Sequence, residues 1–443
     1  MLISKLKPLL AAFGDLIILY GALILTLMVR YGLTSYGDSF IVHLKPFSII
    51  FIIWFLIFYL SDLYSNKFFK LNLAATRVFI IAIVINLFLS VVAFYAFESF
   101  FQLTPKTNLL IFGVIFGILD YLWRLFLAKL FISSGWRKQI LIIGNSPSIA
   151  AVAEYLKNNP QTGYHLNLWF KENFNEEKFS GLVDSIIKNK IDLVIADTHI
   201  KKDSTSAKLI YKLLPLEIQI MDFADFYESI FQKVPLEELE ESWFIESIAT
   251  SRRFYDAFKR TIDAILAVIL IIIFLPIIFL AALLIKTTSA GPAIYKQKRI
   301  GKNNKPFILY KFRTMKNSQK GPLWTDKNDE RLTPIGRILR YTHLDELPQL
   351  LNILKGDISF IGPRPERSEL VELYQKLPFY EIRHIIKPGL TGWAQVNYKP
   401  SASLEEAYEK FQYDIYYIKN RSLILDFLIL LKTIRYLFIS NQN

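Results

Sequence analysis

The segment VFIIAIVINLFLSVVAFYAF, residues Val78–Phe97, decides the fold class, because it holds 20 consecutive residues without a charged side chain. A helix rises about 1.5 Å per residue, so this segment is roughly 30 Å long, the thickness of the hydrocarbon core of a bilayer. Similar apolar runs lie nearby at Leu9–Val29, Phe47–Leu60 and Leu109–Leu130. We therefore predict a bundle of four transmembrane helices over residues 1–134.

Lysine and arginine are distributed unevenly around these runs. Lys5 and Lys7 precede the first run, and Arg137 and Lys138 follow the fourth, whereas the loop after the third run holds only Lys106. Because positively charged loops stay in the cytoplasm, we expect both ends of the bundle on the cytoplasmic side.

The net charge and the cysteine content limit the kinds of partner and site that this chain can have. The net charge is +13, and the chain contains no cysteine, which excludes disulfides, cysteine-based zinc sites and thiol catalysis. A strongly basic chain is expected to bind an anionic partner, which can be nucleic acid, a membrane surface or a phosphorylated substrate. Basic blocks here alternate with apolar ones, so we favour membrane lipids and phosphorylated substrates and expect no nucleic acid.

Residues 135–232 alternate strand-like and helix-like stretches, which is typical of a parallel, Rossmann-like sheet. We expect strands at Gln139–Ile143, His165–Phe170, Ile191–Ala196 and Glu217–Met221. The dinucleotide fingerprint after a first strand needs three glycines, but only Gly144 is present here and Pro147 interrupts the motif. A structural or oligomerising role is the better interpretation, and an acidic linker is expected over residues 233–252.

A second kind of membrane element is expected at residues 254–286. Its apolar stretch, Ala264–Ile285, is about 33 Å long and could span a bilayer by length alone. Basic residues flank both ends, however, which indicates that both ends face the cytoplasm. Pro276 offers a breakpoint for a helix that enters and leaves on one side, and we favour this re-entrant arrangement over a spanning one. A basic β-hairpin is expected after it, over residues 293–312.

Two adjacent carboxylates, Asp345 and Glu346, stand in a stretch otherwise crowded with lysine and arginine. We interpret Asp345 as a helix N-cap, since Pro348 then falls in the first turn and Gly356 supplies the stop. A carboxylate at a helix start feels the positive end of the helix dipole, stays ionised, and lies beside N–H groups that can meet a phosphate. The pattern suits a nucleophile that attacks phosphorus, although an ordinary cap has the same sequence.

The region from Tyr255 to the C-terminus resembles the bacterial sugar transferases, which are polyprenyl-phosphate sugar-1-phosphate transferases, and most closely their large monotopic type. The likeness rests on five ordered motifs, which lie at Gly291–Gly301, Tyr310–Met315, Asp345–Gln349, Lys355–Glu366 and Lys387–Asn397. One departure is that Leu275 precedes Pro276, where the family often has serine. The resemblance implies a catalytic domain over residues 253–443, facing the cytoplasm at the bacterial inner membrane.

In this family the aspartate of the pair attacks the β-phosphate of a UDP-sugar, a role that the resemblance gives to Asp345. UMP leaves, and undecaprenyl phosphate then takes the phosphosugar. Glucose or galactose is the favoured sugar, and exopolysaccharide, capsule or O-antigen the product pathway. Glu346 with Asp345 is implied to hold Mg²⁺. Phosphate binding is expected first from Arg364 and then from the set Glu366, Arg299, Lys311, Arg313 and Arg340.

Three alternatives remain at this point. Asp345 could act as a base in a single-step transfer, the chain could be a non-catalytic membrane scaffold, or the middle domain could bind NAD. The missing glycines weigh against the last. The sequence does not identify the sugar, and a homodimer is one of the oligomeric states that it leaves open.

Overall fold

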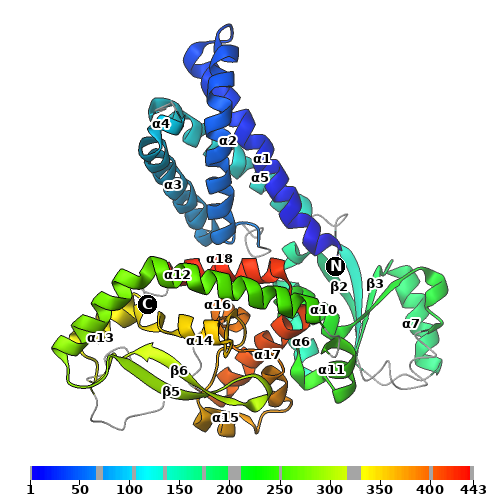
Figure 1. Cartoon of the computed structure of the whole chain (residues 1–443). Helices are drawn as coiled ribbons and strands as arrows, with labels where there is room; N and C mark the ends of the chain where they lie inside the picture. The colour runs from blue at the N-terminus through cyan, green and yellow to red at the C-terminus, as the bar shows by residue number, and fades with distance from the viewer. Residues whose placement is uncertain are drawn as a thin grey trace. The chain divides into compact units, whose positions relative to one another are not determined.

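A computed structural model describes residues 2–439, apart from residues 66–72, 102–105, 133–136, 172–175, 198–210, 249–251, 317–330 and 399–402. The chain forms two compact units, residues 1–230 and 231–443. Much of the described chain is helical, with apolar helices near the N-terminus and a parallel sheet (Figure 1). Five of the described helices are long and apolar enough to cross a membrane.

The N-terminal part of the first unit consists of long helices around an aromatic core. The helices are α1 (Leu2–Tyr31), α2 (Tyr36–Leu60), α3 (Leu73–Ala96) and α5 (Lys106–Ile132), with a short α4 (Glu98–Phe101). Phe47, Trp54 and Phe112 are fully buried between them. The ring of Trp54 meets the ring of Phe112 edge-on at 5.3 Å, a preferred aromatic geometry.

Three charged side chains are sealed inside this part of the molecule. Arg124 of α5 donates to Asp15 of α1 and to Asp120 of its own helix, both at 2.8 Å. Tyr64 donates to the same oxygen of Asp15, and Arg124 also donates to the carbonyl oxygen of Leu63. Charges in an apolar surrounding are tolerated only when paired, so this cluster ties α1, α5 and the end of α2 together.

The rest of the first unit is a four-stranded sheet. Its strands are β1 (Lys138–Ile143), β2 (Tyr164–Phe170), β3 (Leu193–Ala196) and β4 (Gln219–Asp222), all parallel and in the order β2-β1-β3-β4. The described helices beside it are α6 (Pro147–Asn158), α7 (Glu176–Lys188) and α10 (Phe223–Phe231). The predicted parallel sheet is thereby confirmed.

Gly144 has a packing role at the end of β1. Its φ is +139°, and a Cβ there would lie 2.6 Å from the Cδ1 atom of Ile149. Trp169 of β2 donates its indole N–H to the carbonyl oxygen of Gly144 at 2.9 Å. Ser146 caps α6 by accepting from the amide of Ile149. The lone glycine of the degraded motif is therefore explained by close strand–helix packing.

The second unit begins with the acidic segment, which packs against its own unit. This segment contains the 3₁₀ turn η5 (Leu236–Glu238) and helix α11 (Glu241–Ile248). Trp243 and Phe244 are buried, the ammonium of Lys419 lies 4.7 Å from the Trp243 ring, and Phe244 contacts Phe379. The acidic segment is thus anchored to its unit by the apolar side chains of Trp243 and Phe244, which lie between its glutamates.

Helix α12 (Arg253–Thr288) is continuous and contains Pro276. Both of its halves pack on the same unit: Ala267 belongs to a core with Leu350, and Ala281 belongs to another core with Phe312. The helix bends along its length in Figure 1. Its other face is exposed and apolar, as at Ile272, Leu275 and Phe279, the last 71% exposed. An apolar face of this extent needs a cover other than water.

The remaining elements form the body beneath α12. Strands β5 (Ile294–Ile300) and β6 (Pro306–Phe312) pair as an antiparallel hairpin, which confirms that prediction. A parallel pair, β7 (Ser359–Ile361) and β8 (Gly389–Thr391), lies near the centre of the unit. The helices are α13 (Pro334–Tyr341), α14 (Gln349–Lys355), α15 (Ser368–Tyr374), α16 (Trp393–Asn397), α17 (Leu404–Asn420) and α18 (Leu423–Ile439), with 3₁₀ turns η6 (Lys302–Asn304), η7 (Leu344–Glu346) and η8 (Tyr380–His384).

Candidate active site

The two carboxylates lie in a tight 3₁₀ turn rather than at a helix cap. His343 has φ +57°, a left-handed backbone conformation, and reverses the chain after α13. Asp345 and Glu346 then fall in η7, and α14 begins only after Pro348. The prediction of Asp345 as an N-cap is therefore wrong, because Asp345 lies inside the 3₁₀ turn that follows the left-handed His343, and the N-cap of α14 is Pro348. Gly356, with φ +85°, does end that helix as expected.

Glu346 is held by two cations. One of its oxygens, Oε1, accepts from Nζ of Lys311 at 2.6 Å and from the guanidinium of Arg364 at 3.0 Å. Burial alone would raise the pKa of Glu346, but Lys311 and Arg364 outweigh that effect and hold the pKa well below its usual range. Glu346 is therefore ionised at neutral pH and fixes the position of two cationic side chains, Lys311 and Arg364.

Asp345 has the opposite environment. Its side chain is only 8% exposed and makes no hydrogen bond to any residue that the structure describes. Burial raises the pKa of the Asp345 carboxyl, and the nearby charge of Lys311 opposes that rise without cancelling it. The expected dipole effect is thus outweighed by desolvation. A poorly solvated carboxylate that lacks hydrogen bonds is a stronger nucleophile than a solvated one.

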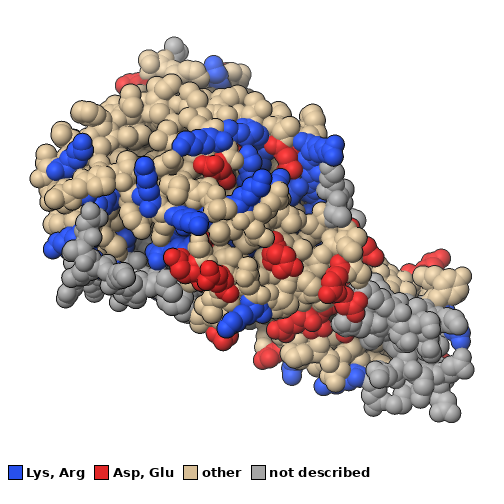
Figure 2. Space-filling model, turned by 60° about the horizontal axis from the view of Figure 1, so that its bottom comes forward, with Lys and Arg blue, Asp and Glu red and all other residues tan. Residues whose placement is uncertain are grey.

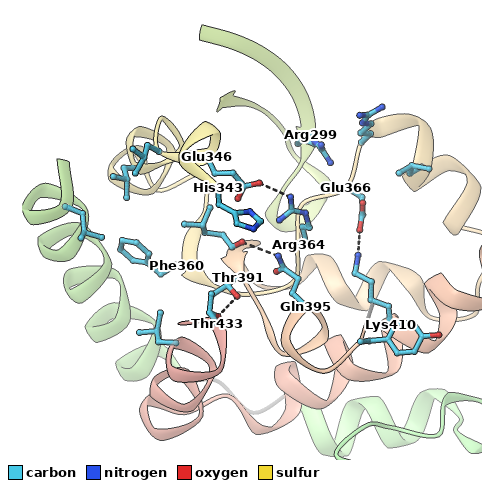
Figure 3. A pocket seen from close by; sticks show the side chains of 18 of the residues that line it. Arg299, His343, Glu346, Phe360, Arg364, Glu366, Thr391, Gln395, Lys410 and Thr433 are labelled. Carbon is cyan, nitrogen blue, oxygen red and sulfur yellow. Dashed lines mark hydrogen bonds and ion pairs between the residues drawn. The ribbon is translucent and has the colours of Figure 1, made fainter. Parts of the chain in front are cut away.

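Glu346 lines a cavity of about 520 Å³ with two kinds of wall, whereas Asp345, one residue before it, is not among the lining residues. Figure 3 shows Glu346, Arg364 and Glu366 on one side of it and Phe360, Thr391 and Thr433 on another. Apolar side chains from α12 and α18, including Leu270, Phe274 and Leu430, close the latter side. The cavity is therefore charged toward η7 and apolar toward the exposed helix α12.

Glu366, which lines the cavity, belongs to a second ionic group. It accepts from Lys410 at 2.8 Å and lies 3.5 Å from Arg383. Burial opposes ionisation, but Lys410 and Arg383 bring the pKa of Glu366 to about 2. Arg383 also pairs with Asp414 at 2.8 Å and donates to the carbonyl oxygen of Arg364 at 3.1 Å. The group thereby fixes the loop that carries Arg364.

The other basic residues predicted from the motifs separate into three places. Arg299 lines the cavity and donates to the carbonyl oxygen of Pro365, and burial lowers its pKa to about 10. Arg340 donates to the hydroxyl of Thr314, and its charge lowers the pKa of Asp345. Arg313 lies apart from this cluster, since its guanidinium binds the carbonyl oxygens of Ser289 and Ala290 and thereby caps α12.

Several lining residues are not in the predicted set. They are His343, Arg367, Thr391, Gln395, Tyr398 and Lys410. Thr391 and Gln395 lie within the motif Lys387–Asn397, and His343 lies two residues before the motif Asp345–Gln349, which is a usable signal. Lys410 and the supporting Arg383 have no local pattern that marks them. Trp393, within the motif Lys387–Asn397, is a buried core residue of α16. Figure 2 shows lysine and arginine side chains grouped around a few carboxylates on one part of the surface. This part of the surface therefore attracts anions.

The carboxylates of the site decide whether a metal ion can bind there. The described residues contain no group of three His, Cys, Asp or Glu side chains that could hold one. Mg²⁺ commonly uses only one or two carboxylates together with substrate phosphates. Asp345 offers a carboxylate with no hydrogen-bond partner among the described residues, next to the ionised Glu346. These residues fit Mg²⁺ on a phosphate-bearing substrate, and do not fit a closed protein-only site.

Comparison with known proteins identifies a family and several relatives of this chain. The profile of the bacterial sugar transferase family matches residues 254–440. The UDP-N-acetylgalactosamine-undecaprenyl-phosphate N-acetylgalactosaminephosphotransferase of Aeromonas hydrophila is 38% identical over 56% of this chain and 59% of its own length. The UDP-glucose:undecaprenyl-phosphate glucose-1-phosphate transferase of Klebsiella pneumoniae is 30% identical over 70% of each chain. The exopolysaccharide production protein PSS of Rhizobium leguminosarum bv. phaseoli is 40% identical over 40% of this chain and 92% of its own length.

Apolar helices, a cationic cavity beside paired carboxylates and these relatives together define the class as a membrane-associated transferase. The chain belongs to the bacterial sugar transferase family.

Proposed function

We propose that this protein transfers a sugar-1-phosphate from a UDP-sugar to undecaprenyl phosphate, giving undecaprenyl-diphosphate-sugar and UMP. The observation that carries the proposal is the two-sided cavity, in which Glu346 and Arg364 lie opposite Leu270 and Phe274 of α12. A soluble phosphorylated donor needs the charged side. A lipid acceptor needs an apolar path from the bilayer to the same phosphorus atom.

Transfer proceeds in two displacements through Asp345. A carboxylate oxygen of Asp345 attacks the β-phosphorus of the donor and forms an acyl-phosphate bond. The bond from that phosphorus to the bridging oxygen breaks, and UMP leaves with the electron pair. A phosphate oxygen of the lipid then attacks the same phosphorus, which forms the diphosphate and frees the carboxylate. Splitting the exchange lets one site serve two unlike substrates in turn.

The neighbouring residues position and neutralise the phosphates. Arg364 has one nitrogen on Glu346, so its remaining N–H groups are available to phosphate oxygens. Arg299 lines the same wall of the cavity. Lys311 and Arg340 favour the ionised form of Asp345, which the first displacement requires. Mg²⁺, held by Asp345, Glu346 and the donor phosphates, would supply charge neutralisation on the leaving UMP.

We further infer that α12 enters and leaves the membrane on the cytoplasmic side. Near its N-terminal end, Arg260 donates to the carbonyl oxygens of Ile353 and Leu354, and near the other end Ile285 packs with Leu339. A helix fastened at both ends to one polar unit cannot carry one end across a bilayer. The exposed apolar face between these contacts suits burial in the lipid. The basic residues that flank α12 support a location in the bacterial inner membrane with the catalytic unit in the cytoplasm.

A panel of UDP-sugars tests the proposal. The full chain in detergent is mixed with Mg²⁺, undecaprenyl phosphate and UDP-glucose, UDP-galactose or UDP-N-acetylgalactosamine, and UMP is measured. We expect release with one or two of these donors, as a first step of exopolysaccharide, capsule or O-antigen synthesis. A scaffold without activity would release no UMP from any donor. Mass spectrometry of quenched enzyme should find the phosphosugar on Asp345; normal turnover without that adduct would favour Asp345 as a base.

A further inference from the structure

A second, smaller cavity lies on the other face of β7. Ser359 and Ile361 line it, whereas Phe360, between them, lines the large cavity. Successive side chains of a strand point to opposite faces, so β7 forms a wall between the two spaces. The small cavity has a volume of about 70 Å³. That is far below the size of an ordinary small-molecule pocket, but it is large enough for a few waters or a group such as a phosphate.

Three cations meet in this space from distant parts of the chain. They are Arg260 of α12, Lys302 at the tip of the β5–β6 hairpin, and Lys387 before β8. A Cβ added to Gly356 would lie 3.2 Å from Nζ of Lys387 and 3.3 Å from Cζ of Arg260, so these two charges crowd over one glycine. Burial, together with the charges of Arg260 and Lys302, lowers the pKa of Lys387.

The carboxylates nearby do not balance these cations. Asp426 is taken by Lys259 at 2.8 Å, and Asp256 lies 3.6 Å from Arg421. Asp263 in the cavity lining and Asp357, whose charge also acts on Lys387, are then the two carboxylates left for Arg260, Lys302 and Lys387, so the cations outnumber them by one. The ammonium groups of Lys302 and Lys387 have no hydrogen bond or ion pair with a residue that the structure describes. A net positive cavity remains, which an anion would stabilise.

Helix capping explains only part of this arrangement. Arg260 binds the last carbonyl oxygens of α14, where a cation is favourable in any protein. Lys302 comes from the hairpin and makes no such contact. The position of the cavity along α12 also matters. Residues 255–263 of α12, several of which line the cavity, directly precede the apolar stretch of that helix. The outer face of this stretch is exposed at Ile265, Leu266 and Ile269. The cavity therefore lies at the level of lipid headgroups for a helix buried in the bilayer surface.

We propose that the headgroup phosphate of an anionic phospholipid binds between Lys302, Lys387 and Arg260. The site would hold a resident lipid beside α12 and anchor the catalytic unit at the membrane surface. It is separate from the reaction, since β7 lies between it and the large cavity. The inference goes beyond the proposed function and needs no sugar donor to be tested.

Lipid retention measures this site directly. The full chain in a mild detergent is given equal amounts of phosphatidylglycerol and phosphatidylcholine, and bound lipids are counted by native mass spectrometry. We expect phosphatidylglycerol to be retained preferentially. The double substitution Lys302→Gln and Lys387→Gln should weaken its binding about 25-fold, or about fivefold for each cation removed. Lys302 is exposed at a hairpin tip, so Lys302→Gln alone tests the site if the double variant folds poorly.

Lys305→Gln is the matched control, because Lys305 is an exposed lysine of the same hairpin tip that does not line the cavity. It should retain the lipid as the wild type does. Equal loss in this control, or unchanged retention in the double variant, would overturn the proposal. Inorganic phosphate that displaces phosphatidylglycerol at equal concentration would also overturn it, since the site would then bind a soluble anion.

Discussion

Two clusters of this protein are held by ion pairs between cationic side chains and carboxylates, but one is sealed from solvent and the other is partly exposed. In the helices of the first unit, Arg124 joins Asp15 and Asp120, and these side chains are 3% exposed or less. In the second unit, Glu346 joins Lys311 and Arg364, and the Arg364 side chain is 36% exposed. The first cluster is sealed by apolar side chains, whereas the second opens on a cavity of about 520 Å³. Pairing alone therefore does not mark a catalytic site.

The difference lies in what the partners leave unsatisfied. All three guanidinium nitrogens of Arg124 donate hydrogen bonds, to Asp15, Asp120 and the carbonyl oxygen of Leu63. Few N–H groups therefore remain for a ligand. Arg364 has one nitrogen on Glu346 and presents the rest of its guanidinium to the cavity. A sealed pair stabilises the fold only while it is complete. An open pair pre-positions a cation for a phosphate.

The sharpest test of this contrast is Asp345→Asn. The amide has nearly the same shape but cannot form an acyl phosphate, so transfer and the exchange of labelled UMP into the donor should both fall by roughly a thousandfold or more. Folding should not suffer, because burial of the ionised carboxylate is unfavourable, as its raised pKa indicates. Thermal melting supplies that control. Full UMP exchange in this variant would contradict a covalent role.

Arg364→Lys should have the next largest effect. Lysine keeps the charge but loses the planar fork that can hold Glu346 and a phosphate together, so we expect kcat/KM to fall about 10- to 100-fold. Arg337→Lys, on the exposed face of α13, is the matched control and should leave kinetics unchanged. If Arg364→Lys behaves like that control, the open cluster is not binding the donor.

Sequence reasoning predicted the local features of this molecule better than the long-range ones. The hairpin and the end of α14 at Gly356 depend on neighbours within a few residues, and both predictions are confirmed. The cap at Asp345 was predicted wrongly, because a rule about flanking residues does not register the left-handed turn at His343. The role of Arg383 depends on Asp414, 31 residues further along, and no local pattern marks such a contact.

The motifs also did not separate binding residues from structural ones. Lys311 and Arg313 lie two residues apart in one motif, yet the first reaches Glu346 and the second caps α12. Strand β6 ends at Phe312, so Arg313 lies outside the strand alternation that orients Lys311. Spacing in a motif gives residue types, whereas the contacts depend on where an element stops.

Acidity offers a finer test of the open cluster. Only the ionised form of Asp345 can attack, so kcat/KM should fall tenfold per pH unit once the pH is below its raised pKa. Lys311 favours the ionised form, so Lys311→Gln should move this acid limb to higher pH. Lys298→Gln, at an exposed position of β5, is the control and should not move it. A limb at the same pH in both variants would mean that another group controls the rate.

The smallest effect on transfer is expected from the sealed cluster. Arg124→Gln leaves two carboxylates without their cation in an apolar surrounding, which should lower the free energy of unfolding by about 3–5 kcal/mol. Turnover per folded molecule should stay within about twofold of the wild type, because the guanidinium of Arg124 is bonded to groups of its own unit. Thermal melting of the detergent-solubilised chain measures the first quantity and UMP release the second. Arg30→Gln, at an exposed position of α1, should change neither. A variant at Arg124 that melts normally but transfers slowly would mean that the sealed cluster, too, takes part in the reaction.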